Sequence, residues 1–181
     1  PRNFFYDWLT INHFSDMSGG GVGVTLSNAD TYYMQLGNST HTALDATTPQ
    51  LNILAGGQVD GPNLGIPNQG GDTKFLQRFA LQTHGAFNQT SAMKFSLEHQ
   101  NPLVTHQVTG TDPSYNEKNY SFLTISDPDV LLWALKPAED GISQGVIARV
   151  WNQANAARNY TLSLAPSIVS GKRTTHIETD I

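Results

Sequence analysis

The chain contains no cysteine among its 181 residues. This absence excludes disulfide bonds, thiolate metal sites and a cysteine nucleophile. Charged residues are also scarce, at 14%, and the net charge of −5 comes without a cluster of Lys and Arg. Nucleic acid is therefore not an expected partner. No apolar run approaches the roughly 20 residues that a membrane-spanning helix needs, so a membrane is not an expected partner either.

The motifs of several common active sites are missing as well. The sequence has no G-x-S-x-G elbow, no H-E-x-x-H zinc motif, no P-loop and no dinucleotide-binding fingerprint. Its six histidines are scattered, and no close grouping predicts a metal site. Glycoside hydrolysis would need a pair of carboxylates, but the 15 acidic residues lie mostly in expected loops and suggest no particular pair. We therefore expect neither a catalytic residue nor a bound metal in this chain.

Aromatic residues indicate that the low charge does not reflect disorder. The 3 Trp, 6 Tyr and 8 Phe occur in apolar runs that need burial in a folded core. These runs are short, rich in β-branched and aromatic residues, and separated by turn-forming residues, which is typical of a β-sandwich or barrel. We expect strands or extended segments at residues 4–14, 22–26, 31–36, 74–83, 103–108, 122–125, 130–136, 145–151, 159–164 and 172–181.

Two segments depart from this strand pattern. Residues 15–21 end in three consecutive glycines and predict a turn. Residues 86–98 predict the only helix, with Ala92, Phe95 and Ser96 on one face, and an Asn-Pro pair shortly afterwards ends it.

The segment 39–73 predicts an irregular loop rich in Gly and Pro. A loop of this length within a compact domain is more often functional or docked than idle, although a simple linker remains an alternative. The expected fold is a single all-β domain over residues 1–181, an antiparallel β-sandwich with one short helix.

A hairpin is expected to lie near the centre of this domain. Its strands, residues 130–136 and 145–151, flank a loop at residues 137–144 that has turn formers at both ends. Both faces of each strand are apolar apart from Lys136 at the end of the first strand and Arg149 in the second. Because a strand that is apolar on both faces is normally covered on both sides, we expect the hairpin to be buried.

Two polar residues are candidates for a substrate-binding or domain-interface role. Arg149 interrupts an apolar strand, and its guanidinium needs an acceptor from its own domain or from a neighbouring one, unless it reaches solvent. His84 follows a strand and is either exposed where the chain leaves the sheet or held by a structural hydrogen bond. Several aromatic side chains could stack on sugar rings, but those within apolar runs are expected in the core: Trp8, Tyr32, Tyr33, Trp133 and Trp151.

Several motifs together resemble a known family. Residues 75–103 combine a strand, a His-Gly turn, a short helix and Asn-Pro-Leu. The run LKPAEDG at 135–141 is followed by VIARVWN at 146–152, while GVTL occupies 23–26 and a Thr- and acid-rich run occupies 174–180. In this order and spacing, the motifs resemble the C-terminal β-sandwich region of glycoside hydrolase family 38 α-mannosidases, over nearly the whole chain.

This resemblance implies that the chain is a fragment of a longer enzyme, in agreement with a first residue that is Pro. In the family, a separate N-terminal domain carries the zinc ion and the Asp nucleophile of a retaining mechanism on mannose-containing glycans. Neither motif occurs in this chain, so no catalytic residue carries over and the fragment alone is expected to be inactive. The implied role is to pack against the catalytic domain and help shape its cleft. Arg149, which matches the arginine of the family's strand motif, is the candidate residue for this role. A stand-alone carbohydrate-binding or structural module is the alternative.

Overall fold

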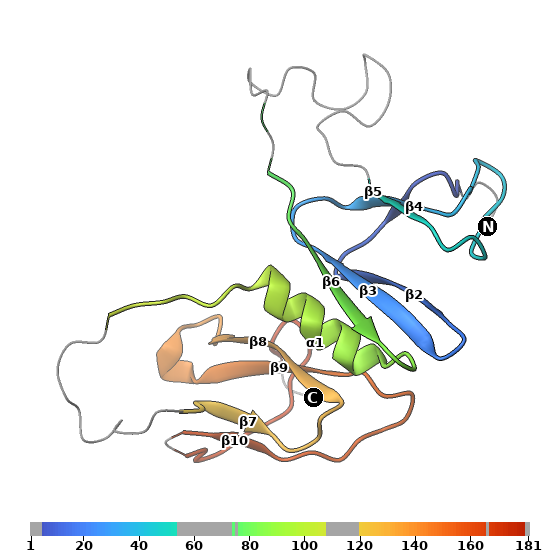
Figure 1. Cartoon of the computed structure of the whole chain (residues 1–181). Helices are drawn as coiled ribbons and strands as arrows, with labels where there is room; N and C mark the ends of the chain where they lie inside the picture. Colours follow the sequence, from blue (N-terminus) through green and yellow to red (C-terminus); the bar gives the residue numbers. More distant parts are fainter. Residues whose placement is uncertain (1–4, 54–73, 75, 108–119, 166, 180–181) are drawn as a thin grey trace. The chain divides into compact units, whose positions relative to one another are not determined.

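The computed structural model describes residues 5–53, 74, 76–107, 120–165 and 167–179. The chain divides into two compact units, residues 1–103 and residues 104–181. Every strand pair among the described residues is antiparallel, and one α-helix accompanies the sheets (Figure 1). The described structure is thus mostly antiparallel sheet, consistent with an all-β fold.

The first unit contains two three-stranded sheets. The strands are β1 (Leu9–Thr10), β2 (Phe14–Gly19), β3 (Val22–Asn28), β4 (Tyr33–Leu36), β5 (Leu51–Ile53) and β6 (Phe79–His84). One sheet has the order β1-β4-β5. The other has the order β2-β3-β6 (Figure 1). A tight turn at Gly20 and Gly21 joins β2 to β3. Both residues have positive φ, at 61° and 81°, which glycine adopts without steric cost.

The two faces of the β2-β3-β6 sheet differ in polarity. Residues paired directly across antiparallel strands point to the same side, so the register assigns each side chain to a face. The more polar face carries Asp16, Ser18, Thr25, Ser27, Gln82 and His84, together with Phe14 and Ala80. The more apolar face, called the apolar face below, carries Met17, Val22, Val24, Leu26, Phe79 and Leu81, together with Ser15, Asn28 and Thr83.

Helix α1 (Gln89–Gln100) begins and ends at residues with capping side chains. At the N-terminus, the Asn88 Oδ1 accepts a hydrogen bond from the Ser91 backbone N–H at 2.8 Å, which satisfies one of the free amides of the first turn. At the C-terminus, Asn101 donates both its backbone N–H and its side-chain amide to the carbonyl of Leu97. A proline follows and prevents further helical turns.

The helix packs against the polar face through a hydrogen-bonded seam. Ser27 Oγ lies 3.0 Å from Ser96 Oγ and 2.9 Å from His99 Nδ1. Ser96 Oγ also donates to the carbonyl of His13 at 2.5 Å. Ser27 and Ser96 are both fully buried. Because buried hydroxyl groups are stable only when they are hydrogen-bonded, this seam specifies how the helix sits on the sheet.

The second unit contains two two-stranded sheets. Its elements are β7 (Leu123–Ile125), β8 (Val130–Pro137), a short 3₁₀ helix (Ile142–Gln144), β9 (Val146–Asn152) and β10 (Leu162–Leu164). β7 pairs with β10, and β8 pairs with β9. The β8-β9 register shifts between Leu132 and Ala134, where a bulge accommodates Trp133.

Few apolar side chains are buried among the described residues. They are Ile11, Met34, Ala92 and Met93 in the first unit, and Val130 and Leu131 in the second. The β8-β9 hairpin was expected to be covered on both sides, but Trp133, Leu135, Val146 and Trp151 are exposed. That prediction is wrong for the described structure, because the hairpin forms a two-stranded sheet and has no neighbouring strand in it.

Three further predictions differ from the structure. Residues 15–19 belong to β2 and do not form a turn, because Asp16 has hydrogen-bond partners across the sheet. Residues 103–107 form no strand. Residues 172–179 do not form a strand along their length; instead, the chain closes on itself, with Thr175 N–H donating to the carbonyl of Thr179 at 2.8 Å.

Most of the remaining strand predictions are confirmed in type with shifted bounds. Of the described residues in 4–14, only Leu9–Thr10 and Phe14 lie in strands, and the strand predicted at 74–83 begins only at Phe79. The helix is also confirmed: Ala92 and Ser96 are buried as expected, whereas Phe95 is only half-buried. Of the predicted loop 39–73, residues 51–53 form β5, and residues 54–73 lie outside the described residues.

Candidate functional site

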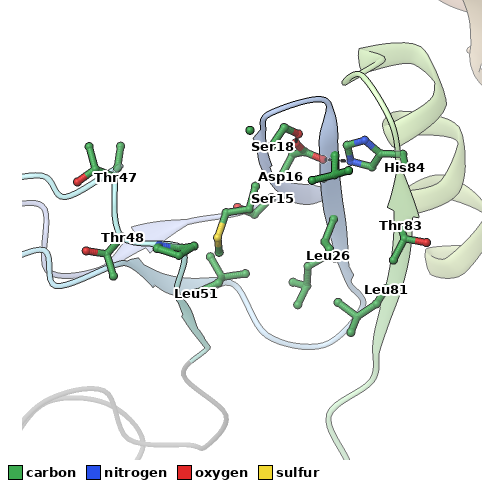
Figure 2. Close-up of a pocket in the computed structure, with 17 residues that line it drawn as sticks. Ser15, Asp16, Ser18, Leu26, Thr47, Thr48, Leu51, Leu81, Thr83 and His84 are labelled. Carbon is green, nitrogen blue, oxygen red and sulfur yellow. Dashed lines mark hydrogen bonds and ion pairs between the residues drawn. The ribbon is translucent and has the colours of Figure 1, made fainter.

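An imidazole–carboxylate pair lies at one end of the β2-β3-β6 sheet. His84 is the last residue of β6, and its Nε2 lies 2.7 Å from Asp16 Oδ2 on β2 (Figure 2). Thr25 of the intervening β3 donates its hydroxyl to the same Oδ2 at 2.6 Å, and Ser18 donates to Oδ1. The four side chains link all three strands, because the register places them on the same face.

The contacts of the pair favour the charged form of each partner. Burial raises the pKa of Asp16, but hydrogen bonds from Ser18, Thr25 and His84 outweigh it, so that the pKa lies below its usual value. The hydrogen bond to Asp16 raises the pKa of His84, and a second bond to the carbonyl of Gly85 has the same effect. That second bond joins Nδ1 and the Gly85 oxygen at 3.0 Å. Since both ring nitrogens face acceptors, the imidazolium satisfies both.

Glycine at position 23 makes room for this cluster. A Cβ built on Gly23 would lie within 2.5 Å of Ser18 Oγ and would also overlap the His84 ring. Gly23 pairs with both Ser18 and His84 in the register, so it occupies the gap that the two side chains share. The close approach of Asp16 to His84 across β3 therefore depends on the missing side chain.

A largely apolar groove of about 830 Å³ adjoins the cluster. Leu26 and Leu81 contribute from the sheet and Leu51 from β5, while Thr47 and Thr48 lie on the opposite wall (Figure 2). The groove therefore follows the apolar face. Two of the side chains on that face, Val22 and Leu81, are 68% and 67% exposed, so the face is open to a further packing partner.

The chemistry of this arrangement favours support over catalysis. A general base needs a lone pair directed at the substrate, but both nitrogens of His84 are engaged within the protein. Asp16 is likewise occupied by three side-chain donors. The cluster therefore fixes the strands beside the groove, and the groove offers an apolar surface with hydroxyl groups at its edge.

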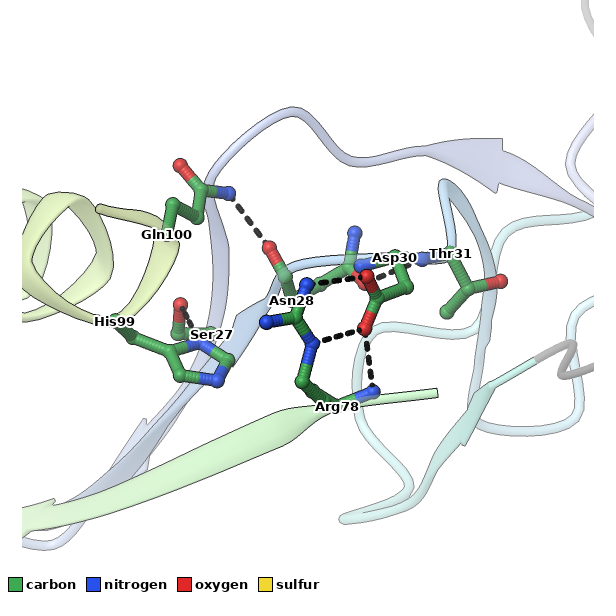
Figure 3. Close-up of polar contacts among 7 residues, drawn as sticks. All are labelled: Ser27, Asn28, Asp30, Thr31, Arg78, His99 and Gln100. Carbon is green, nitrogen blue, oxygen red and sulfur yellow. Dashed lines mark hydrogen bonds and ion pairs between the residues drawn. The ribbon is translucent and has the colours of Figure 1, made fainter. Parts of the chain in front are cut away.

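A second polar cluster closes the opposite end of the same sheet. Arg78 binds Asp30 with two parallel hydrogen bonds of 2.9 Å and 2.7 Å, and its backbone N–H donates to the same carboxylate (Figure 3). This guanidinium lowers the pKa of Asp30 to about 2. Buried Asn28 accepts the backbone N–H of Thr31 at 2.7 Å and holds the turn that presents Asp30.

Arg149 lies in the second unit and is exposed. Its Nη2 donates to the carbonyl of His176 at 3.1 Å and lies 3.9 Å from Glu178 Oε1. Glu178 also binds Lys136 Nζ at 2.5 Å and accepts the backbone N–H of Glu139 at 2.8 Å. These contacts hold the turn at 175–179 against the hairpin. Arg149 thus finds its acceptors within its own unit, one of the alternatives left open by the sequence.

The aromatic side chains expected in the core are more exposed than predicted. Trp133 and Trp151 are 44% and 42% exposed, and their rings meet edge to face at 5.0 Å. The other three side chains are also at least one-third exposed: Trp8, Tyr32 and Tyr33. Apolar sequence runs indicate a need for burial, but they do not say whether a protein core or a binding partner provides it.

Two important residues were not singled out from the sequence. Asp16 lies in a segment interpreted as a turn, although the alternation of Phe14, Asp16 and Ser18 is compatible with a strand. Glu178 lies in a segment interpreted as a strand, and its φ of 66°, uncommon for a residue other than glycine, gives no signal in the sequence.

The described residues contain no group of three or more His, Cys, Asp or Glu side chains placed to hold a metal ion. Within the same part of the chain, no helix is long and apolar enough to cross a membrane. No protein-family model, curated protein or solved structure matches this sequence.

Proposed function

We propose that this chain is a non-catalytic β domain of a larger glycoside hydrolase, a retaining zinc-dependent α-mannosidase that acts on terminal α-mannosyl linkages. Its role is to pack against the catalytic domain and help shape the sugar cleft. The sequence resemblance motivates the enzyme class. The zinc ion and the nucleophile belong, on this proposal, to the catalytic domain outside this chain.

The apolar face of the β2-β3-β6 sheet is the observation that carries the proposal. In a self-sufficient domain, a helix normally covers the apolar side of a sheet and leaves the polar side to water. Here α1 covers the polar face through hydrogen bonds, while Val22 and Leu81 on the apolar face remain more than half exposed. A second layer that covers this face would complete the sandwich, and we propose that the parent enzyme supplies it.

A substitution within the parent enzyme tests the docking role. Leu81→Asp places a charge within the proposed interface, where burial of an unpaired carboxylate is costly. We expect its thermal unfolding temperature to fall by several degrees. The matched control is Leu44→Asp, at a residue that is 49% exposed and lies outside the apolar face. Equal effects of the two substitutions would contradict the docking role.

The isolated chain tests the catalytic part of the proposal. Purified without contaminating glycosidase, the 181-residue chain should not hydrolyse an aryl α-mannoside, with or without added zinc. Turnover that copurifies with the chain would show that it carries its own catalytic residues.

A stand-alone carbohydrate-binding module is the second candidate function, and the exposed pair of Trp133 and Trp151 favours it. The candidates differ in the role of the apolar face. A stand-alone module does not need Leu81 for docking, so Leu81→Asp would then be tolerated.

A further inference from the structure

A second groove, of about 680 Å³, lies within the second unit and differs in character from the first. Aromatic rings from Trp133, Trp151 and Tyr160 line it together with cationic side chains from Arg149, Lys172 and Arg173. Among the described lining residues there is no Asp or Glu. The groove therefore combines flat apolar surfaces with positive charge in a chain whose net charge is −5.

The aromatic surface is available to a ligand. Trp133, at the β-bulge of β8, and Trp151, on β9, meet edge to face with an angle of 86° between their rings. In this arrangement the edge of one ring contacts the face of the other, and the Trp151 side chain remains 42% exposed. Tyr160 is 43% exposed and extends the surface.

The opposite wall of the groove is held in place before any ligand binds. It consists of the segment 172–176, which Arg149 anchors through the carbonyl of His176. Behind this wall, the ion pair of Glu178 with Lys136 fixes the turn that follows. A site with fixed walls binds with a smaller entropic cost than one that must first be ordered.

The cationic side chains of the groove indicate that the ligand carries an acidic group. Glu178 lies 3.9 Å from Arg149 and partly balances its charge. No hydrogen bond or ion pair engages the Arg173 guanidinium among the described residues, so it can bind a carboxylate, phosphate or sulfate with two parallel hydrogen bonds. Exposed indole faces carry partial negative charge and attract the partly positive C–H groups on one side of a pyranose ring.

We propose that this groove binds an acidic saccharide. The pyranose ring stacks on the exposed indole of Trp151, beside the nearly perpendicular ring of Trp133, and the acid group binds at Arg173 with support from Arg149. Single-stranded nucleic acid would also use aromatic rings and cations, but the net negative charge of the chain disfavours a long polyanion. The inference rests on this groove alone and holds whether or not the apolar face docks.

Fluorescence titration provides a direct test. Because the sequence has only 3 Trp, Trp8→Phe in the full chain leaves Trp133 and Trp151 as the only indole reporters. We expect methyl glucuronoside and glucose 6-phosphate each to produce a saturable change in emission. Neutral methyl glucoside should bind about tenfold more weakly, since it lacks the charged hydrogen bonds. Inorganic phosphate, which lacks a ring to stack, should leave the emission unchanged.

Two substitutions in the Trp8→Phe background separate the parts of the site. Trp151→Leu should weaken binding of both acidic sugars by about tenfold or more, as expected for loss of a central aromatic contact. Arg173→Gln, at an exposed position, should reduce the affinity for acidic sugars to that for the neutral sugar. The control Arg158→Gln removes a cation that pairs with Asp129 outside the groove and should leave binding unchanged.

The proposal would be overturned by a flat titration with both acidic sugars, by equal affinity for acidic and neutral sugars, or by an emission change that inorganic phosphate reproduces. Tighter binding of a single-stranded oligonucleotide than of the acidic sugars would also overturn it.

Discussion

His84 and Asp16 form an ion pair across the full width of a three-stranded sheet, with 2.7 Å between Nε2 and Oδ2. The strand between them, β3, contributes Gly23, which leaves space for the imidazole, and Thr25, which donates a hydrogen bond to the carboxylate. The pair therefore couples the first and last strands of the sheet. Its charge state should affect the stability of the whole unit.

The stability conferred by this pair should depend on pH in a defined direction. The folded-state pKa of His84 is raised above 6.5, so its contribution is complete below pH 6.5 and is lost as the pH rises through the raised value. The folded-state pKa of Asp16 is lowered below 3.8, so its contribution is complete above pH 3.8 and is lost as the pH falls through the lowered value. The pair should stabilise the protein most between about pH 4 and 6.5.

Urea unfolding of the wild type and of His84→Gln across this range measures the effect. The difference in unfolding free energy should be largest inside the window and should shrink on both sides. A titration of the His84 ring followed by NMR should also give a midpoint above 6.5. A midpoint below this value would show that the imidazolium is not stabilised.

Replacement of Gly23 should disrupt the same cluster through steric overlap. We expect Gly23→Ala to lower the unfolding free energy by about 1–3 kcal/mol, the usual cost of an overpacked site. Gly19→Ala is the control, because a Cβ there meets nothing within 4 Å and the residue lies in the same sheet. The comparison requires only equilibrium denaturation. A similar small effect for both variants would argue against the close approach of Ser18 and His84 to Gly23.

The hydroxyl seam between α1 and the sheet should contribute measurably to stability. Ser96→Ala removes the hydrogen bonds to Ser27 and to the carbonyl of His13 from a fully buried position. We expect a loss of about 1–3 kcal/mol in unfolding free energy, because two hydrogen bonds of a fully buried hydroxyl group are removed. The exposed Ser91→Ala on the same helix should change it by less than about 0.5 kcal/mol. Circular dichroism during thermal or urea unfolding distinguishes the two variants, and equal losses would contradict the role of the seam.

The stability of the turn at residues 175–179 should depend on the negative charge of Glu178. Glu178 accepts the backbone N–H of Glu139 and pairs with Lys136, which lowers the pKa of Glu178. Glu178→Gln should therefore speed hydrogen exchange at the Glu139 amide. Glu139→Gln is a matched control, since the exposed Glu139 side chain also contacts Lys136, at 3.3 Å. If the two substitutions have the same effect on exchange, the Glu178 carboxylate does not hold the turn.

Local sequence patterns predicted most of the individual helices and strands, but not which strands pair with one another. The helix α1 could be predicted, because Ala92 and Ser96 share a face and an Asn-Pro pair follows, although it begins three residues later than the predicted start at residue 86. Residues 15–19 were interpreted as a turn because glycines follow them, and the partner of Asp16 that favours a strand, His84, lies 68 residues away. The apolar content of the hairpin around Arg149 indicated a need for cover, but not whether the chain itself supplies that cover.

The two candidate site residues, His84 and Arg149, could also be singled out from the sequence without their contacts being predicted. His84 was singled out because it ends a strand before a glycine, and its hydrogen bonds correspond to the structural alternative. Arg149 was singled out as a cation in an apolar strand, yet its partners, His176 and Glu178, lie in a segment that was interpreted as an edge strand. Single-sequence periodicity contains no information on such contacts, since they form only when distant segments meet.

The size and activity of the native gene product test the central claim most directly. An antibody raised against this chain should detect, in extracts of the source cells, a protein far larger than 19.7 kDa. The same antibody should deplete zinc-dependent α-mannosidase activity from the extract. A native product of 19.7 kDa, or depletion of the antigen without loss of that activity, would contradict the account.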